Sequence, residues 1–297
     1  MIKAQTPKGF GDMLPETAKR KRVLLQKIGD TLENLGFQPM ETPTVEFADA
    51  LLGKYGDEAD KLVYTFEDRG GRKLALRYDL TVPLARFISS NPSVIASGPF
   101  SRFQTGQVFR GENPQKGRYR EFTQFDIDTV GSSDLREDAR IIAAVLACCK
   151  AIGIKAKMQI NDRKNFEGLT TDVIIAVDKL DKIGDDGVIE ELEEKGVDNA
   201  RQVLESVKNK KPTTDLQTIF DYLKEMGVDE AQIEFVPTLA RGLDYYTGSI
   251  FELRLINEDL SVGGGGRYDN LIGTFTGKQI PAVGFAFGID RLLEVMP

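Results

Sequence analysis

The sequence predicts an α+β fold, in which strands and helices are segregated along the chain. Runs with the composition of β-strands occupy residues 62–67, 73–79, 103–111, 119–130, 245–256 and 282–287. These runs do not alternate regularly with helices, which argues against a doubly wound parallel sheet. A helical, acidic segment separates the first four runs from the last two, and no internal repeat is evident.

The first element expected is an amphipathic helix over residues 16–35. Its apolar stripe consists of Leu24, Leu25, Ile28, Leu32 and Leu35, which recur at helical spacing. Gly36 follows directly, at the position where glycine commonly ends a helix.

The runs 103–111 and 119–130 are expected to pair as a long antiparallel hairpin, because the basic segment between them contains proline and glycine. Side chains alternate between the two faces of a strand. In the second run one face carries Glu121, Thr123, Phe125, Ile127 and Thr129. The other, more polar face carries Arg120, Phe122, Gln124, Asp126 and Asp128.

This polar face either is solvated or forms the floor of a site, where a rigid sheet holds polar groups in fixed geometry. Positive charge gathers around the hairpin at Arg110, Lys116, Arg118 and Arg120, in a chain whose formal net charge is −7. Guanidinium groups suit phosphate oxygens. The pattern therefore favours a nucleotide or a nucleic acid as ligand.

Residues 171–235 are expected to form a small helical domain, inserted into a main domain made of 1–170 and 236–297. The stretch 178–235 carries 16 acidic and 8 basic side chains. Its apolar residues recur at helical spacing, and its short helices are separated by Gly184, Gly187, Gly196, Pro212 and Gly227. The alternative is a charged helical layer of the main domain.

Composition excludes several classes of protein. The chain contains no histidine, which excludes catalysis by a protein imidazole and histidine-ligated zinc. Its only cysteines, Cys148 and Cys149, are adjacent in an apolar helical run, so a reduced, cytoplasmic protein with both thiols in its core is expected. No apolar run approaches the roughly 20 residues that span a bilayer, and the first residues lack the apolar core of a secretory signal. We therefore expect neither a membrane protein nor a secreted one.

Two later segments contain more glycine, charge and tyrosine than a core requires. The run 240–248 places Arg241, Tyr245 and Tyr246 just before a strand. The run 263–269 begins with four glycines, at which a ligand can approach the backbone closely; a plain flexible turn is the alternative. Neither segment has the spacing of a dinucleotide-binding fingerprint or of a Walker phosphate loop.

Several motifs together resemble those of the histidyl-tRNA synthetases, a family of class II aminoacyl-tRNA synthetases. The resemblance covers residues 6–296. The segments that carry it are 36–43 (similar to motif 1, with Pro43), Phe109-Arg110-Gly111-Glu112 with Arg118-Tyr119-Arg120-Glu121-Phe122 (motif 2), 284–291 (motif 3), Arg77-Tyr78-Asp79-Leu80-Thr81-Val82-Pro83, and the two histidine-specific motifs 239–248 and 264–269.

This resemblance implies an antiparallel six-stranded sheet flanked by helices, with a helical insertion between motif 2 and the first histidine-specific motif. It also implies a homodimer formed around motif 1. The anticodon-binding domain that family members carry after motif 3 is expected to be absent, because the chain ends at Pro297. The implied reaction activates L-histidine with ATP to histidyl-adenylate and transfers the histidine to the 3′ end of tRNA(His). A carboxylate is already ionised at neutral pH, so no protein general base is needed; arginines and Mg²⁺, carried mainly by ATP, would stabilise the phosphate charge.

The resemblance also assigns roles to single residues. Arg110 and Arg241 would be the catalytic cations, on opposite sides of the α-phosphate. The expected ATP-binding residues are Arg110, Glu112 (at the adenine amino group), Phe122 (stacked on the base), and Arg118 and Arg291 (at the γ-phosphate). The expected histidine-binding residues are Asp79, Thr81 and Gln124 (at the α-ammonium group), Asp128 and Tyr246 (at the imidazole nitrogens), and Tyr245.

Two alternatives stay open. One is a non-catalytic relative of the family, the synthetase-like regulatory subunit of ATP phosphoribosyltransferase in histidine biosynthesis, which often lacks the anticodon-binding domain. Its members usually lose the adenylation arginines or the histidine motifs, which are present here. The other alternative is a synthetase for another amino acid, such as proline or threonine.

Overall fold

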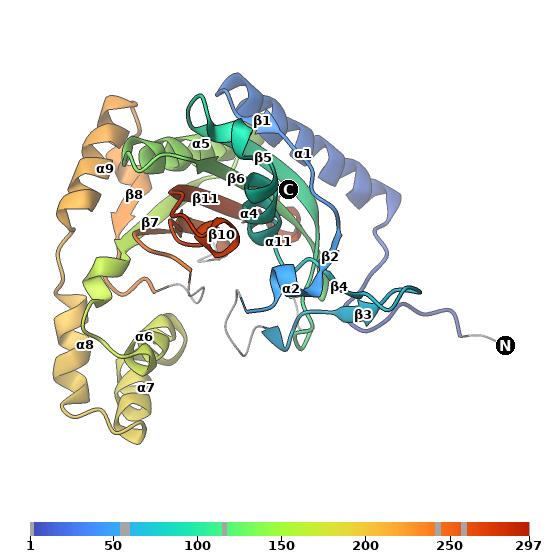
Figure 1. Ribbon diagram of the computed structural model, residues 1–297. Helices are drawn as coiled ribbons and strands as arrows, with labels where there is room; N and C mark the ends of the chain where they lie inside the picture. The colour runs from blue at the N-terminus through green and yellow to red at the C-terminus, as the bar shows by residue number, and fades with distance from the viewer. Residues whose placement is uncertain (1–2, 54–59, 115–117, 241–244, 257–259, 297) are drawn as a thin grey trace.

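An eight-stranded mixed sheet runs through the centre of the molecule (Figure 1). The computed structural model describes residues 3–53, 60–114, 118–240, 245–256 and 260–296. Among the six inner strands, neighbours are antiparallel to each other. At the two edges, β1 pairs in parallel with β5, and β8 pairs in parallel with β7. In spatial order the strands are β1 (Gln38–Pro39), β5 (Phe100–Phe109), β6 (Glu121–Val130), β11 (Ala282–Gly288), β10 (Ser261–Arg267), β9 (Ser249–Leu255), β7 (Ala156–Asp162) and β8 (Ile233–Phe235).

The α+β prediction is confirmed, but the expected antiparallel six-stranded sheet is wrong for the sheet as a whole. The strands β1 and β8 are too short to show an alternating pattern, so the sequence gives no sign of them. β10 is missed for another reason, since it consists largely of glycine, which is depleted in strands. The sheet requires glycine there, because a Cβ at Gly265 would lie 2.0 Å from the carbonyl oxygen of Gly284 on β11.

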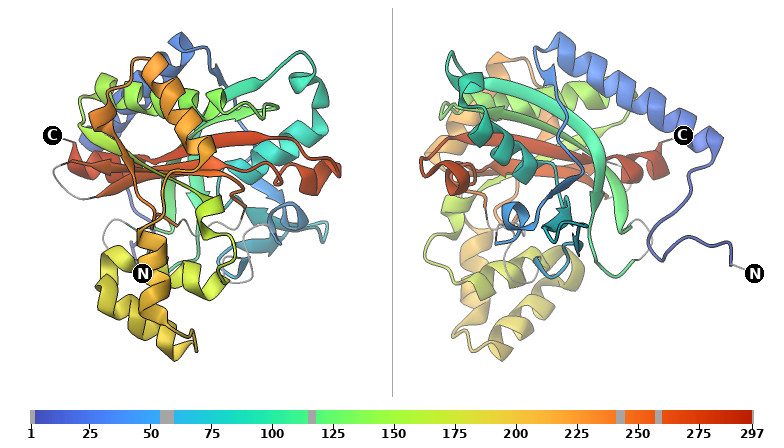
Figure 2. Two further views of the ribbon diagram at one scale, coloured as in Figure 1. Left: turned by 90° about the vertical axis from the view of Figure 1, so that its left-hand side faces the viewer. Right: turned by 45° about the vertical axis from the view of Figure 1, so that its right-hand side comes forward.

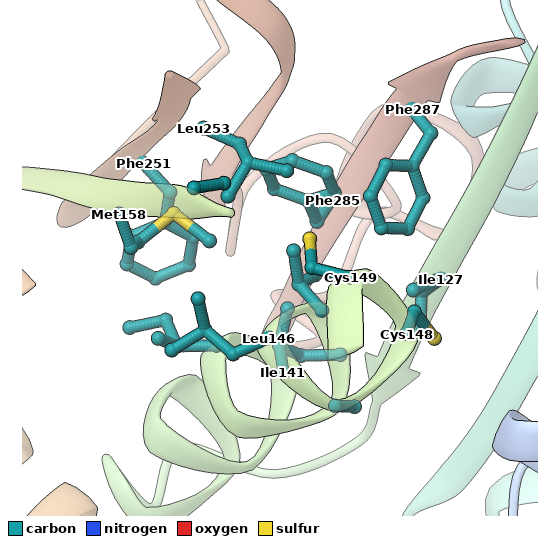
Figure 3. Packing of buried hydrophobic residues seen from close by; sticks show 14 of the residues in the cluster. Ile127, Ile141, Leu146, Cys148, Cys149, Met158, Phe251, Leu253, Phe285 and Phe287 are labelled. Atoms are coloured by element: carbon teal, nitrogen blue, oxygen red, sulfur yellow. The ribbon is translucent and has the colours of Figure 1, made fainter. Parts of the chain in front are cut away.

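One face of the sheet is covered by α1 (Pro15–Asn34), α5 (Arg136–Ile152) and α9 (Thr214–Glu225), which share one apolar core with the strands. The predicted helix 16–35 is confirmed as α1, and Gly36 follows it with φ 83°. Cys148 and Cys149 lie on α5 among the apolar side chains of the strands (Figure 3). Both are free and buried, and burial raises the pKa of the Cys148 thiol to about 12, so they are unreactive core residues.

The opposite face of the sheet packs against α4 (Thr81–Ser90) and α2 (Ala48–Leu51), which form a second apolar core with a small sheet in the order β2-β4-β3. None of the helices within the described ranges combines the length and apolar character needed to cross a membrane. The remaining elements are β2 (Val45–Phe47), β3 (Thr65–Glu67), β4 (Lys73–Leu76), α10 (Gly273–Thr276), α11 (Ile289–Val295) and 3₁₀ turns at Pro92–Ile95, Arg163–Phe166 and Glu230–Gln232.

Residues 171–235 pack in two different ways. The helices α6 (Thr171–Asp178), α7 (Leu180–Glu194) and α8 (Ala200–Lys208) project away from the sheet (Figure 2). They share an apolar core that also includes Phe166, Ala240 and Ile250 of β9. Gly184 has φ 68° and ψ 178°, which are not helical, so it separates two short helical pieces within α7, as the sequence predicts. By contrast, α9 and β8 pack against α5 and β7. The division of the chain into a main domain and an insertion over 171–235 stays a prediction.

Candidate active site

A cavity of about 480 Å³ lies on the face of the sheet opposite α5. The β5–β6 hairpin, the residues that precede α4, and strands β10 and β11 line it. Every predicted site residue within the described ranges lines this cavity: Asp79, Thr81, Arg110, Glu112, Arg118, Phe122, Gln124, Asp128, Tyr245, Tyr246 and Arg291. Arg241, the remaining predicted residue, lies outside the described residues.

The floor of the cavity follows from the alternation of side chains along β6. Phe125 and Ile127 point into the apolar core, whereas Phe122, Gln124 and Asp128 point into the cavity, as the period of two predicts. Gly284 on β11 lies directly opposite Asp128, and a Cβ there would lie 1.9 Å from Oδ1 of Asp128. The strand next to β6 must therefore carry glycine at this point for the Asp128 carboxylate to fit.

Arg110 is held in place at the end of β5. Its guanidinium carbon lies 4.4 Å from the ring centre of Tyr78 and 5.1 Å from that of Phe122. Its Nε donates a hydrogen bond to the carbonyl oxygen of Tyr78 at 3.1 Å, and Nη2 donates one to Oε1 of Gln124 at 3.4 Å. Two aromatic rings and two acceptors thus fix the orientation of a cation that lines the cavity.

Two further arginines lie at the outer rim of the cavity. Arg118 donates a hydrogen bond from Nε to the Glu112 carboxylate, and it is about half exposed. Arg291, at the start of α11, donates a hydrogen bond from Nη1 to the carbonyl oxygen of Ser261 at 3.2 Å. Together with Arg110, these side chains give the cavity a positively charged end, which suits a polyphosphate.

The opposite end of the cavity is acidic and has two corners. In the first corner, Oδ1 of Asp79 accepts hydrogen bonds from the backbone amides of Thr81 and Val82 at 3.1 and 3.0 Å, at the start of α4. Gln124 and Thr81 both donate to Asp126, from Nε2 at 2.9 Å and from Oγ1 at 3.4 Å. This corner therefore presents carboxylates, an amide and a hydroxyl, which suit an ammonium group.

In the second corner, Asp128 is held by two neighbours. Tyr268 donates a hydrogen bond from its hydroxyl to Oδ1 at 2.5 Å, and Nη2 of Arg102 lies 2.7 Å from Oδ2. Tyr245 packs edge-on against both Tyr246 and Tyr268, with ring centres 5.0 and 5.9 Å apart. Burial raises the pKa of both Tyr245 and Tyr268 well above the ordinary value, so both phenols are neutral near pH 7.

Three residues of this acidic end were not predicted as site residues. Asp126 lines the cavity, and its place on the polar face of β6 was a usable signal. Tyr268 also lines the cavity and stands inside a motif that the sequence singled out. Arg102 is fully buried behind Asp128 and gave no signal, because a lone arginine in a strand of mixed composition has no distinctive spacing.

Burial changes the ionisation of the acids. Burial, together with the nearby Asp128 and Asp79, raises the pKa of Asp126 to about 7, although the Arg102 guanidinium partly opposes this rise. Burial also raises the pKa of Asp128, against the opposing effect of Arg102 and of the Tyr268 hydrogen bond. Among the described residues no group of three or more acidic or cysteine side chains is arranged to hold a metal ion.

Comparisons with known proteins identify the family. Residues 9–185 and 188–292 match the family described as histidyl-tRNA synthetase. The histidine–tRNA ligase of Aeropyrum pernix is 41% identical over 97% of this chain and 73% of that protein. The crystal structure of histidyl-tRNA synthetase from Nostoc sp. PCC 7120 matches with a TM-score of 0.85 at 30% identity, over 99% of this chain and 75% of that chain.

A Bacillus halodurans structure described as an ATP phosphoribosyltransferase regulatory subunit/histidyl-tRNA synthetase shares the fold, with a TM-score of 0.79 at 24% identity over 100% of this chain and 84% of that chain. At that identity the likeness concerns the fold alone. The family match, in contrast, extends over almost the whole sequence and includes both ends of the cavity. This chain therefore belongs to the histidyl-tRNA synthetase family.

Proposed function

We infer that this protein is a histidine–tRNA ligase, which activates L-histidine with ATP and transfers it to tRNA(His). The observation that carries this inference is the two-ended cavity, in a chain that belongs to the family. Arginines line one end, and carboxylates with tyrosines line the other, as expected for a site that joins a polyphosphate to an amino acid with an ammonium group and an imidazole.

In the first step we propose that a carboxylate oxygen of histidine attacks the α-phosphorus of ATP. The new bond joins that oxygen to phosphorus, the bond from phosphorus to the bridging β-phosphate oxygen breaks, and pyrophosphate leaves with the bond electrons. No proton has to be removed from the nucleophile. The protein's contribution is to align the two substrates and to stabilise negative charge on the phosphate oxygens.

Arg110 is the best-placed side chain for the α-phosphate, because its guanidinium is already oriented by Tyr78, Phe122 and Gln124. Phe122 would stack on adenine and Glu112 would accept a hydrogen bond from its amino group. Arg118 and Arg291 at the rim would bind the γ-phosphate. Mg²⁺ would enter with ATP as part of the substrate and neutralise phosphate charge.

At the acidic end, Asp79, Thr81 and Gln124 would bind the α-ammonium group of histidine. Asp128 and Tyr246 would bind the two imidazole nitrogens, with Tyr245 packed beside them. The Asp128 carboxylate can accept a hydrogen bond, and the Tyr246 hydroxyl can donate or accept one. The pair therefore matches a neutral imidazole, which has one donor and one acceptor nitrogen.

In the second step a ribose hydroxyl at the 3′ end of tRNA attacks the histidyl carbonyl carbon. The bond from that carbon to the phosphate oxygen breaks, AMP leaves with the bond electrons, and the hydroxyl proton passes to the phosphate of AMP. We propose Arg241 as the second cation at the α-phosphate in both steps. If it stabilises charge that develops in the transition state, Arg241→Ala should lower the single-turnover rate of adenylate formation by about 10²–10³. Arg241→Lys should restore little of this, because the lysine ammonium lacks the planar fork.

We further propose that the protein is a cytoplasmic homodimer. Cytoplasmic location follows from its substrate, since tRNA is charged where translation occurs, and it suits two free cysteines. The dimer is supported by the β2-β4-β3 sheet next to Pro43, which exposes the apolar side chains of Val45, Phe47 and Phe66. Sedimentation of a folded sample as a monomer at micromolar concentration would contradict it.

Histidine-dependent exchange of pyrophosphate into ATP tests the proposed activity. We expect exchange with histidine and none with proline or threonine. Arg110→Ala is the control for catalysis by this cavity and should lower the rate about 10²–10³-fold. A folded protein that binds histidine but supports no exchange would instead favour the regulatory-subunit function, which the present arginines and the family match do not favour.

A further inference from the structure

We propose that Asp126 is the counter-ion of the α-ammonium group of bound histidine, and that histidine binding expels a proton from this carboxyl group. The proposal rests on the proposed function, since it assumes that histidine occupies the acidic end of the cavity. Asp126 would be a further binding residue of that site, and histidine binding would depend on pH because this carboxyl group must ionise.

Asp126 lies beside the proposed ligands of the ammonium group. Its side chain is 2% exposed and lines the cavity. It lies between two proposed ammonium ligands, since Gln124 donates to its Oδ1 and Thr81 donates to its Oδ2. Both of these partners are neutral. A cation that reaches Thr81 and Gln124 must therefore also reach the Asp126 carboxyl group.

Asp126 has no contacting cation among the residues that the structure describes. Arg102, from β5, is committed to Asp128 and to the carbonyl oxygen of Leu80 at 3.2 Å. Arg77 donates to two backbone carbonyls, those of Gln107 at 2.7 Å and Thr42 at 2.8 Å. Arg110 is oriented by Tyr78 and Gln124. Within the described parts of the chain, no ion pair within 4.0 Å joins Asp126 to a basic side chain.

The surroundings of this carboxyl group favour its protonated form. Asp128 on the same strand and Asp79 before α4 both raise the pKa of Asp126, and Arg102 lowers it. Arg77 is a second nearby cation, since burial lowers the pKa of its guanidinium and the charge of Asp126 opposes this by raising it. Tyr245 faces it as a neutral phenol, and Gln104 and Ala286 are its neighbours on the adjacent strands. Asp79 differs from Asp126, because backbone amides at the start of α4 already stabilise its charge.

A buried carboxylate with anionic neighbours and no contacting cation is unfavourable, so the group takes up a proton near neutral pH. An incoming ammonium group supplies the missing positive charge and favours the ionised form. The proton then leaves to solvent, and the carboxylate and the ammonium remain as a buried pair. Histidine affinity should therefore rise with pH from about 6 to about 8, where this proton no longer has to be displaced.

Titration calorimetry of the full chain in buffers with different ionisation enthalpies counts the protons released. Triazolylalanine is the preferred probe, since its ring does not titrate near neutral pH, and L-histidine is measured beside it. With Asp126 at a pKa of about 7, we expect about half a proton released at pH 7 and close to one at pH 6. Almost none should be released at about pH 8.5.

Asp126→Asn mimics the protonated acid and assigns the proton to this residue. We expect it to bind the probe about 10- to 100-fold more weakly, with no proton release and a flat affinity profile between about pH 6 and 8. Asp185→Asn is the matched control, because Asp185 is a half-exposed acid on α7 that pairs with Lys208. It should release as many protons as the parent. Infrared difference spectra give a second reading, the loss of a protonated carboxyl band when the probe binds to the parent.

The outcomes separate this proposal from the proposed function. If the parent binds the probe at pH 6 without releasing a proton, the proposal is wrong even though the histidine site stands. If Asp126→Asn binds and still releases the proton, another acid is the source and the proposal is again wrong. If the parent binds no histidine at any pH, the proposed function itself fails. Should Asp126→Asn not fold, Asp126→Ser replaces it to assign the proton, and the absence of proton release from the parent at pH 6 still overturns the proposal.

Discussion

Asp128 is held from two sides: Tyr268 donates a 2.5 Å hydrogen bond to its Oδ1, and Arg102 lies 2.7 Å from its Oδ2. Arg102 stands directly opposite Asp128 on β5, whereas Tyr268 directly follows β10. The carboxylate is thus oriented on both sides before any substrate arrives. Tyr268 is therefore a positioning residue for the proposed imidazole contact.

Removal of the Tyr268 hydroxyl tests this arrangement. Tyr268→Phe keeps the ring that packs against Tyr245 but leaves Asp128 with one partner fewer. A hydrogen bond to a charged group is worth about 1.5–3 kcal/mol, so we expect histidine affinity to fall about 10- to 100-fold. The KM for ATP should not change. Tyr222→Phe, on α9 beside Arg136, is the control and should alter neither constant.

A methyl group at Gly284 should have a similar effect from the other side. Gly284→Ala would place its Cβ 1.9 Å from Oδ1 of Asp128, and the backbone of β11 cannot move away without loss of its pairing with β6. We expect Asp128 to be displaced and the KM for histidine to rise at least tenfold. A folded variant with unchanged histidine KM would show that the orientation of Asp128 is not critical.

The control for Gly284→Ala is the same substitution at Gly11, where a Cβ would meet no heavy atom within 4 Å. Gly11→Ala should leave both the histidine KM and the melting temperature within error of the parent. Circular dichroism of both variants separates displacement of Asp128 from loss of the fold.

Arg118 should matter for ATP but hardly for stability. It is half exposed and paired with Glu112, and exposed ion pairs contribute only about 0–1 kcal/mol. Arg118→Ala should raise the KM for ATP about tenfold and shift the melting temperature by no more than a few degrees. Arg136→Ala is a matched control, since Arg136 is equally exposed and pairs with Glu225. If both variants affect ATP equally, Arg118 does not bind the nucleotide.

The sequence predicted best those elements whose pattern extends over many residues. The helix over 16–35 and the hairpin of β5 and β6 both have long, regular patterns, and both are confirmed. The two faces of β6 were assigned correctly because alternation persists through ten residues. Short edge strands and the glycine-rich β10 were not foreseen, because tertiary contacts, not local preference, make them strands.

The site was predictable in part for the same reason. The period of two along β6 places Gln124 and Asp128 on the face that lines the cavity. It places Asp126 on the same face but does not indicate the role of that residue. That role depends on the charges around the carboxyl group. Asp79, which precedes α4, raises the pKa of Asp126, and Arg102 on β5 pairs with Asp128 and not with Asp126. Such pairings between residues far apart in the sequence cannot be predicted from the spacing of residues along the chain.

The raised pKa of Asp126 makes a prediction about stability that needs no substrate. An acid whose pKa is higher in the folded state holds its proton more tightly there, so its contribution to the free energy of unfolding falls as pH rises from about 4 to about 7. From an ordinary value of 3.8 to about 7, at about 1.4 kcal/mol per unit, the loss is on the order of 4 kcal/mol. Asp126→Asn cannot ionise and should escape this loss.

The melting temperature of Asp126→Asn should therefore improve relative to the parent by several degrees between about pH 5 and about pH 8. The comparison of two proteins at each pH removes the effects of other titrating acids, Asp128 and Asp138 among them, whose pKa values burial also raises. Saturating histidine should reverse the order at about pH 8, because the parent then gains a buried ion pair that the variant lacks. A difference in melting temperature that stays constant across this range would mean that Asp126 ionises like an ordinary aspartate.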